Sequence, residues 1–279
     1  AMRPYADRMQ ELMIGTARAS SSVRGLALLQ RRETIRTVAI LPLTGDRGLA
    51  GAFNTNVLRH AFALERELKA EGVTVKWLVA GKKGGSTLRF RGYEVAQSWT
   101  GFSDRPQYAD AQAIANRLAT LYAEGEVDKV VVVYNHFVSA LVQNVVAQDV
   151  LPIPENLLEG DDSADQKEAA LRGDFIYEPE PEEILKRLLP VYVETEIYRA
   201  LLESAASEQG ARMTAMRNAS KSAGDHAGDP RGRRRRGRPH RLAAAPHGSD
   251  ERPGPAPGLS HSVTVLSRFD GRSYGRTIP

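Results

Sequence analysis

Glycine recurs at every third position between two segments of different character. Gly45, Gly48 and Gly51 follow the apolar residues 37–43 and precede an amphipathic segment. Glycine-rich turns between a strand and a helix bind phosphate through their backbone N–H groups. Here the spacing is G-x-x-G-x-x-G instead of G-x-G-x-x-G, and no acid follows at the distance that holds a ribose. Phosphate binding therefore competes with a purely structural turn in which Asp46 caps the following helix.

A second glycine-rich run, residues 81–86, also resembles a phosphate-binding loop. It reads Gly-Lys-Lys-Gly-Gly-Ser, which lacks both the Gly-Lys-Ser/Thr order and the spacing of a P-loop. We expect this run to form a flexible basic turn that follows a strand.

No other combination of residues predicts catalysis or metal binding. The chain has no cysteine and six histidines. Of the histidines, only His60 and His136 lie in the segments expected to form an α/β domain, and neither has a Cys, His or acid at ligand spacing. The sequence contains no Ser-His-Asp arrangement and no pair of carboxylates placed for acid–base chemistry. We therefore predict no catalytic residue, no cofactor-binding residue and no metal site.

The last part of the chain carries its basic character. Residues 226–279 contain eleven Arg, no Lys and four acids, together with 7 of the 15 prolines, whereas residues 1–225 are net negative. Such a composition predicts a disordered tail. Within it, residues 233–239 read Arg-Arg-Arg-Arg-Gly-Arg-Pro, which resembles an AT-hook that lies in the minor groove of A·T-rich DNA. The alternative is non-specific attraction to any polyanion.

The overall composition is that of a globular protein. Of the 279 residues, 42% are hydrophobic and 26% are charged. No apolar run approaches the roughly 20 residues that a membrane-spanning helix needs. We therefore expect a soluble, cytoplasmic protein.

Apolar β-rich segments alternate with helical ones in the first half of the chain. Such strands, apolar on both faces and separated by helices, indicate an α/β fold with a mainly parallel, Rossmann-like sheet. A further strand at residues 140–150 follows a short turn at residues 135–137, so it should pair antiparallel to its predecessor. The expected strands are residues 37–43, 73–80 and 127–134, and the expected helices are residues 54–71 and 107–124.

Two long helical patterns flank this domain. One covers residues 4–31, and the other comprises a short helix at residues 182–189 and a continuation from residue 191 to about 223. The short helix and its continuation together span about 42 residues, which corresponds to roughly 60 Å of helix. Their apolar and small residues predict an antiparallel coiled coil. The expected domains are residues 1–33 (partial N-terminal helix), 34–178 (α/β domain), 179–225 (C-terminal helix) and 226–279 (disordered tail).

Three segments, residues 45–54, 188–204 and 205–219, are similar in order and spacing to the gamma subunit of the bacterial F-type ATP synthase. They read GDRGLAGAFN, LLPVYVETEIYRALLES and AASEQGARMTAMRNA. The resemblance covers about residues 2–225. It implies a rotor shaft whose coiled coil enters the ring of alpha and beta subunits. The α/β domain would then stand on the membrane rotor ring beside epsilon.

The resemblance also implies what such a subunit does. It would catalyse nothing itself and would couple proton flow to ATP synthesis by rotation, as a peripheral protein on the cytoplasmic face of the cell membrane. It would reach the membrane only through the complex and bind no specific nucleic acid. The residues expected to contact other subunits are Asp46, Arg47, Asn54, Glu196, Tyr198, Glu203, Arg212, Met213 and Met216.

Two departures from the family pattern modify this expectation. The family's basic first helical stretch does not precede Arg3, and nothing after Asp225 resembles its C-terminal helix. The sequence therefore predicts a shaft truncated at its N-terminus and divergent or frame-shifted after about residue 225, with rotor function reduced or lost. Two other classes compete with this one: a nucleic-acid-binding protein that uses the AT-hook-like tail, and a nucleotide-binding enzyme built on residues 36–155.

Overall fold

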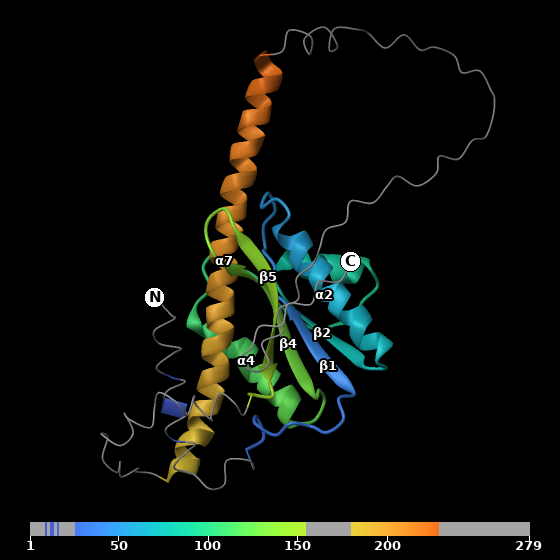
Figure 1. Cartoon of the computed structure of the whole chain (residues 1–279), viewed down its shortest axis with the longest axis vertical. Helices are drawn as coiled ribbons and strands as arrows, with labels where there is room; N and C mark the ends of the chain where they lie inside the picture. Colours follow the sequence, from blue (N-terminus) through green and yellow to red (C-terminus); the bar gives the residue numbers. More distant parts are fainter. Residues whose placement is uncertain (1–8, 10–11, 14–15, 17–25, 155–179, 229–279) are drawn as a thin grey trace, which may run out of the picture. The chain divides into compact units, whose positions relative to one another are not determined.

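The computed structural model describes residues 9, 12, 13, 16, 26–154 and 180–228. Figure 1 shows a sheet with helices on both faces and one long helix. The strands are β1 (Thr37–Pro42), β2 (Thr74–Ala80), β3 (Val95–Trp99), β4 (Lys129–Phe137) and β5 (Gln143–Leu151). The helices are α2 (Phe53–Ala70), α3 (Lys82–Phe90), α4 (Tyr108–Ala123) and α7 (Pro181–Gly228).

The five strands form one mixed sheet in the order β3-β2-β1-β4-β5. The first four are parallel, and β5 pairs antiparallel to β4. The predicted α/β fold with a mainly parallel sheet and an antiparallel last strand is therefore confirmed. Central strands are apolar on both faces because both faces are covered, and the four valines from Val130 to Val133 are at most 3% exposed.

Each face of the sheet has its own apolar core. On one face, Val57 and Ala61 of α2 and Leu88 of α3 pack against β1, β2 and β4. On the other, Ile114 and Leu118 of α4 share a cluster with residues of α7. Burying each of the valine, leucine and isoleucine side chains among these contributes about 2 kcal/mol.

The expectation of a flexible basic turn at residues 81–86 is wrong, because these residues begin α3. Helix starts leave backbone N–H groups without partners. Here the turn after β1 supplies them: Lys82 N donates to Asp46 Oδ1 (2.9 Å), Lys83 N to the Gly45 carbonyl oxygen (3.1 Å), and Gly84 N to Thr44 Oγ1 (3.0 Å). These distant acceptors offset the poor helix propensity of the glycines. Strand β3 was likewise absent from the prediction.

Two further expectations about local structure are corrected. Asp46 does not cap α2, whose first turn has no side-chain cap; its carboxylate instead caps α3. Residues 135–137 do not form a turn but extend β4, since His136 pairs with Asn144 and Phe137 with Gln143. The chain reverses direction between Phe137 and Gln143, where the backbones of Ser139 and Val142 exchange hydrogen bonds.

Helix α7 is continuous through Pro190, whereas the sequence predicted a short helix before that proline and a new first turn at it. Proline removes one backbone hydrogen bond from a helix. Burial offsets this loss, because Leu189 and Val193 on either side are 2% and 1% exposed. The chain divides into two compact units, residues 1–214 and 215–279, and the α/β domain lies in the first.

Most of the predicted N-terminal helix lies outside the described residues. Met9 and Met13 are helical there, and they are buried in the same cluster as Leu185 and Leu189 of α7. The antiparallel coiled coil and the predicted domain boundaries remain predictions. Of the predicted tail, residues 229–279 lie outside the described part, and residues 226–228 continue α7.

Replacing Gly81 by Ala should destabilise the α/β domain by more than about 3 kcal/mol. Gly81 has φ 95°, and a Cβ there would lie 1.9 Å from the Thr44 carbonyl oxygen. Gly72→Ala is the matched control, since Gly72 has φ 79° but open space around the added carbon; it should cost only about 1–2 kcal/mol. Urea unfolding of both variants measures the difference, and equal losses would contradict the close approach.

Candidate functional site

Ligands of open α/β sheets bind beyond the carboxyl ends of the strands, at the point where the strand order reverses. In this sheet that point lies between β1 and β4, because the chain continues from β1 to β2 on one side and returns to β4 on the other. The glycine turn follows β1 directly. The carboxyl edge at β1 and β4 is therefore the place to test for a binding site.

Asp46 ties three loops together at this edge. Its Oδ1 accepts the Lys82 N–H at 2.9 Å, and its Oδ2 accepts those of Gly101 (2.8 Å) and Ser103 (3.2 Å). Its own N–H donates to Ser103 Oγ at 2.8 Å. Burial raises the pKa of the Asp46 carboxyl, but the bonds from these backbone groups outweigh it and leave the pKa below its usual range.

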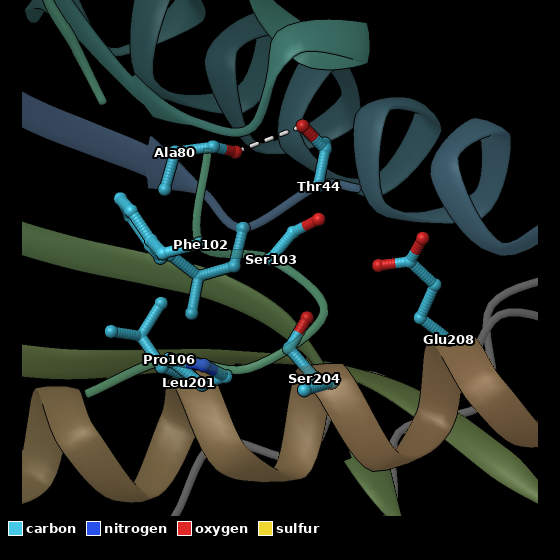
Figure 2. Close-up of a pocket in the computed structure, with 10 residues that line it drawn as sticks. Thr44, Ala80, Phe102, Ser103, Pro106, Leu201, Ser204 and Glu208 are labelled. Carbon is cyan, nitrogen blue, oxygen red and sulfur yellow. Dashed lines mark hydrogen bonds between the residues drawn. The ribbon is translucent and has the colours of Figure 1, made fainter. Parts of the chain in front are cut away.

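Helix α7 occupies the crevice that a ligand would need. Glu208 is 1% exposed, and a Cβ on Gly45 would lie 2.5 Å from its Oε1. Figure 2 shows Leu201, Ser204 and Glu208 rising from α7 toward the loops of the sheet. The remaining cavity is about 10 Å³, room for one water at most. A carboxylate thus stands at the glycine turn where phosphate would bind, which argues against a nucleotide there.

Alternating charges continue from the crevice to the surface. Burial raises the pKa of Glu208, although its bond to Arg212 opposes the shift. Asp104 lies between Arg212 (3.7 Å) and Arg47 (2.8 Å) and also accepts a hydrogen bond from the Gln209 side chain. This network connects α7 with the loops after β1 and β3.

Further along α7, more polar side chains contact the domain. Glu194 accepts a hydrogen bond from the Tyr108 hydroxyl at 2.6 Å, and the Tyr108 and Tyr198 rings meet edge to face, with centroids 5.6 Å apart. Glu196 accepts from Gln148 Nε2 at 2.6 Å. The Glu203 carboxylate pairs with His136 Nδ1 of β4. The helix is therefore attached to α4, β5 and β4 by polar bonds as well as by apolar packing.

The predicted contact residues divide into two groups. Arg47, Met213 and Met216 are exposed, with 76% of the Arg47 side chain and 53% and 40% of the two methionines accessible. The others are engaged in contacts within the chain, as Arg47 is through Asp104: Asp46, Asn54, Glu196, Tyr198, Glu203 and Arg212. Whether either group contacts other subunits remains a prediction.

Sequence reasoning missed several residues of this edge. Asp104, Ser103 and Glu208 gave no pattern, since their partners lie far away in the chain. Leu49 is 75% exposed and has φ 65°, a left-handed conformation that is rare for a leucine. Only its position between two glycines pointed to a tight turn.

Neither a metal-ligand cluster nor a membrane-spanning helix occurs among the described residues. Within residues 9–16, 26–154 and 180–228, as far as these are described, no three His, Cys, Asp or Glu side chains gather as metal ligands would. In the same part of the chain, no helix combines the length and the apolar character needed to cross a bilayer.

The fold and this edge define an α/β protein in which the chain's own helix takes the place of a ligand. A family model described as ATP synthase matches residues 1–239, which extends past residue 225, where the resemblance was expected to end. The ATP synthase gamma chain of Rubrobacter xylanophilus is 44% identical over 224 residues, covering 80% of this chain and 74% of that protein. The gamma chain of Moorella thermoacetica is 40% identical over 225 residues, covering 81% and 74%.

A solved structure agrees with these relatives. The central stalk and c-ring of the Tetrahymena thermophila mitochondrial ATP synthase contains a chain that matches with a TM-score of 0.53 and 25% identity, covering 79% of this chain and 98% of that one. The chain therefore belongs to the family of ATP synthase gamma chains, the rotor stalk of the F-type ATP synthase. The family resemblance seen in the sequence is confirmed.

Membership places the chain in a membrane-associated complex. None of these comparisons supports the nucleic-acid-binding alternative. The AT-hook-like residues 233–239 lie outside the described part of the structure.

Replacing Asp46 by Asn should cost about 1–2 kcal/mol at neutral pH, because hydrogen bonds from three backbone N–H groups lose a charged acceptor. The folded-state pKa of Asp46 is lowered. Its contribution is therefore present above the unfolded-state pKa of about 4 and is lost as the pH falls through the folded-state pKa. Unfolding free energies at pH 7 and pH 3 measure the effect. Asp149→Asn, which removes a surface ion pair with Lys129, should change stability by less than about 1 kcal/mol.

Proposed function

We propose that this chain is a non-catalytic shaft that couples proton flow through a membrane rotor ring to ATP synthesis in an alpha and beta catalytic head. Membership of the family supports the role of a rotor stalk. The more specific proposal rests on the packing of α7 across the carboxyl edge of the sheet. Where a related fold would hold a nucleotide, this one holds its own helix. The edge thus serves to attach a helix and not to turn over a substrate.

The partners that we propose are the alpha, beta and epsilon subunits and the membrane rotor ring, on the cytoplasmic face of the membrane. An open depression of about 500 Å³ lies beside Arg47 and is also lined by Gly101, Phe102, Asp104, Arg105 and Gln209. Leu49 is exposed in the same turn. Arginine is enriched at protein interfaces and among their hot spots, and burial of the exposed Leu49 side chain would add apolar contact.

Reconstitution tests this function directly. The chain, co-expressed with alpha, beta and epsilon subunits of a close relative, should co-purify as an ATPase complex. Placed on the membrane sector in vesicles, that complex should acidify the vesicle lumen when ATP is added, but less per ATP hydrolysed than the relative's own gamma chain supports, since the sequence predicts reduced rotor function. Co-purification without any ATP-driven acidification would remove the coupling role, and absence of co-purification would remove the partners as well.

Arg47→Ala should weaken this assembly while leaving the chain folded. The Arg47–Asp104 pair is exposed on the arginine side, so its loss should change the unfolding free energy by less than about 1 kcal/mol. Binding to the alpha–beta head should weaken by about tenfold and depend less on salt. Arg187→Ala is the matched control, since that side chain is 75% exposed and also pairs with a carboxylate. Equal affinities of the two variants would contradict a contact through Arg47.

A further inference from the structure

Helix α7 buries an unusual set of carboxylates against the α/β domain. Glu194 and Glu196 are 6% and 8% exposed, and the Glu203 side chain is 11% exposed. Burial of a carboxylate is costly, and apolar residues of similar size often stabilise as well or better. Stability alone therefore does not explain why these positions are acidic. Their partners suggest another role.

The three carboxylates bind three different elements. Glu194 accepts hydrogen bonds from Tyr108 and Gln112 of α4. Glu196 accepts one from Gln148 of β5 and also pairs with Arg199 of its own helix. Glu203 pairs with His136 of β4. Beside the last pair, Ser207 Oγ donates to the Asn135 carbonyl oxygen at 3.1 Å. We call Glu194–Tyr108, Glu196–Gln148 and Glu203–His136 the register contacts.

Apolar and polar contacts resist different movements. Apolar packing opposes separation of the helix from the sheet, but it is non-directional and tolerates rearrangement between side chains of similar size. Hydrogen bonds and ion pairs need a defined distance and angle. If α7 turned about its own axis by one residue, Glu194 and Glu203 would lose their partners on other elements, whereas Glu196 would lose Gln148 and keep Arg199 of its own helix. Breaking a buried charged pair costs about 3–5 kcal/mol.

We propose that Glu194, Glu196 and Glu203 are positioning residues that stop α7 from turning against the α/β domain under load, so that torque passes between them through the register contacts. This inference rests on the proposed rotor function. It adds to that function the side chains at which the helix is locked to its base. Loss of a register contact then lets the helix slip during turnover without releasing it from the domain.

Glu203→Leu in the assembled complex is the decisive variant. Leucine keeps the apolar packing of α7, and His136 is 38% exposed, so water hydrates the imidazole that loses its partner. We expect assembly and ATP hydrolysis to be retained, while the acidification of vesicles per ATP hydrolysed falls by about twofold or more, as slip replaces coupled rotation. Glu203→Gln, which keeps a directional hydrogen bond to His136, should restore most of the lost coupling.

Glu183→Leu is the matched control on the same helix. Glu183 pairs with Arg187 one turn away on the same helix, and its side chain is 51% exposed. It should leave the acidification per ATP unchanged. If Glu203→Leu and Glu183→Leu gave the same ratio, the proposal would be overturned.

Tyr108→Phe keeps the experiment decisive if Glu203→Leu fails to assemble. It removes one hydroxyl oxygen from a register contact and keeps the ring against Tyr198. Coupling should fall with assembly retained, and because Gln112 Nε2 still donates to Glu194 at 3.3 Å, the unfolding free energy should fall by less than the loss of a whole buried pair would cost. Normal coupling in this variant would also overturn the proposal. Failure of the unaltered chain to assemble would instead refute the proposed function, so the two failures are distinguishable.

Discussion

The carboxylate of Asp46 accepts hydrogen bonds from backbone N–H groups of two other loops, and this one side chain holds the carboxyl edge of the sheet together. Because Asp46 caps α3 and fixes the loop after β3, the loops at this edge form a defined surface against which another element can pack. Gly45 has no Cβ, so the Glu208 carboxylate can approach that surface closely. These two local features allow α7 to pack against this edge.

This docking changes what the fold can do. Parallel sheets with this strand order commonly bind nucleotides where the order reverses. Here the crevice is filled by Leu201, Ser204 and Glu208, and a cavity of about 10 Å³ remains. The same edge that supports catalysis in other proteins becomes a joint between a domain and a helix. A joint of buried polar pairs resists rotation, which suits a rotor stalk better than an apolar interface alone would.

Much of the fold was predictable from the sequence, and the failures share a cause. The buried strands and the helices α2 and α4 carry strong local patterns, so their positions were predicted to within a few residues. Helix α3 was missed because its glycines oppose a helix and its first N–H groups bind residues 44–46. At the site, Asp46 and Glu203 were recognised through the family resemblance. Asp104 and Glu208 were not, since their partners are close only in the folded chain.

By itself, the sequence determined the α/β class, the antiparallel last strand and the family, because hydrophobic periodicity and the glycine turn are properties of neighbouring residues. Only the tertiary structure decided that Asp46 caps α3 instead of α2, that Pro190 lies within a continuous helix, and that the possible phosphate turn faces a carboxylate. Each of these depends on contacts between distant segments, where the balance of burial and hydrogen bonding overrides local preference.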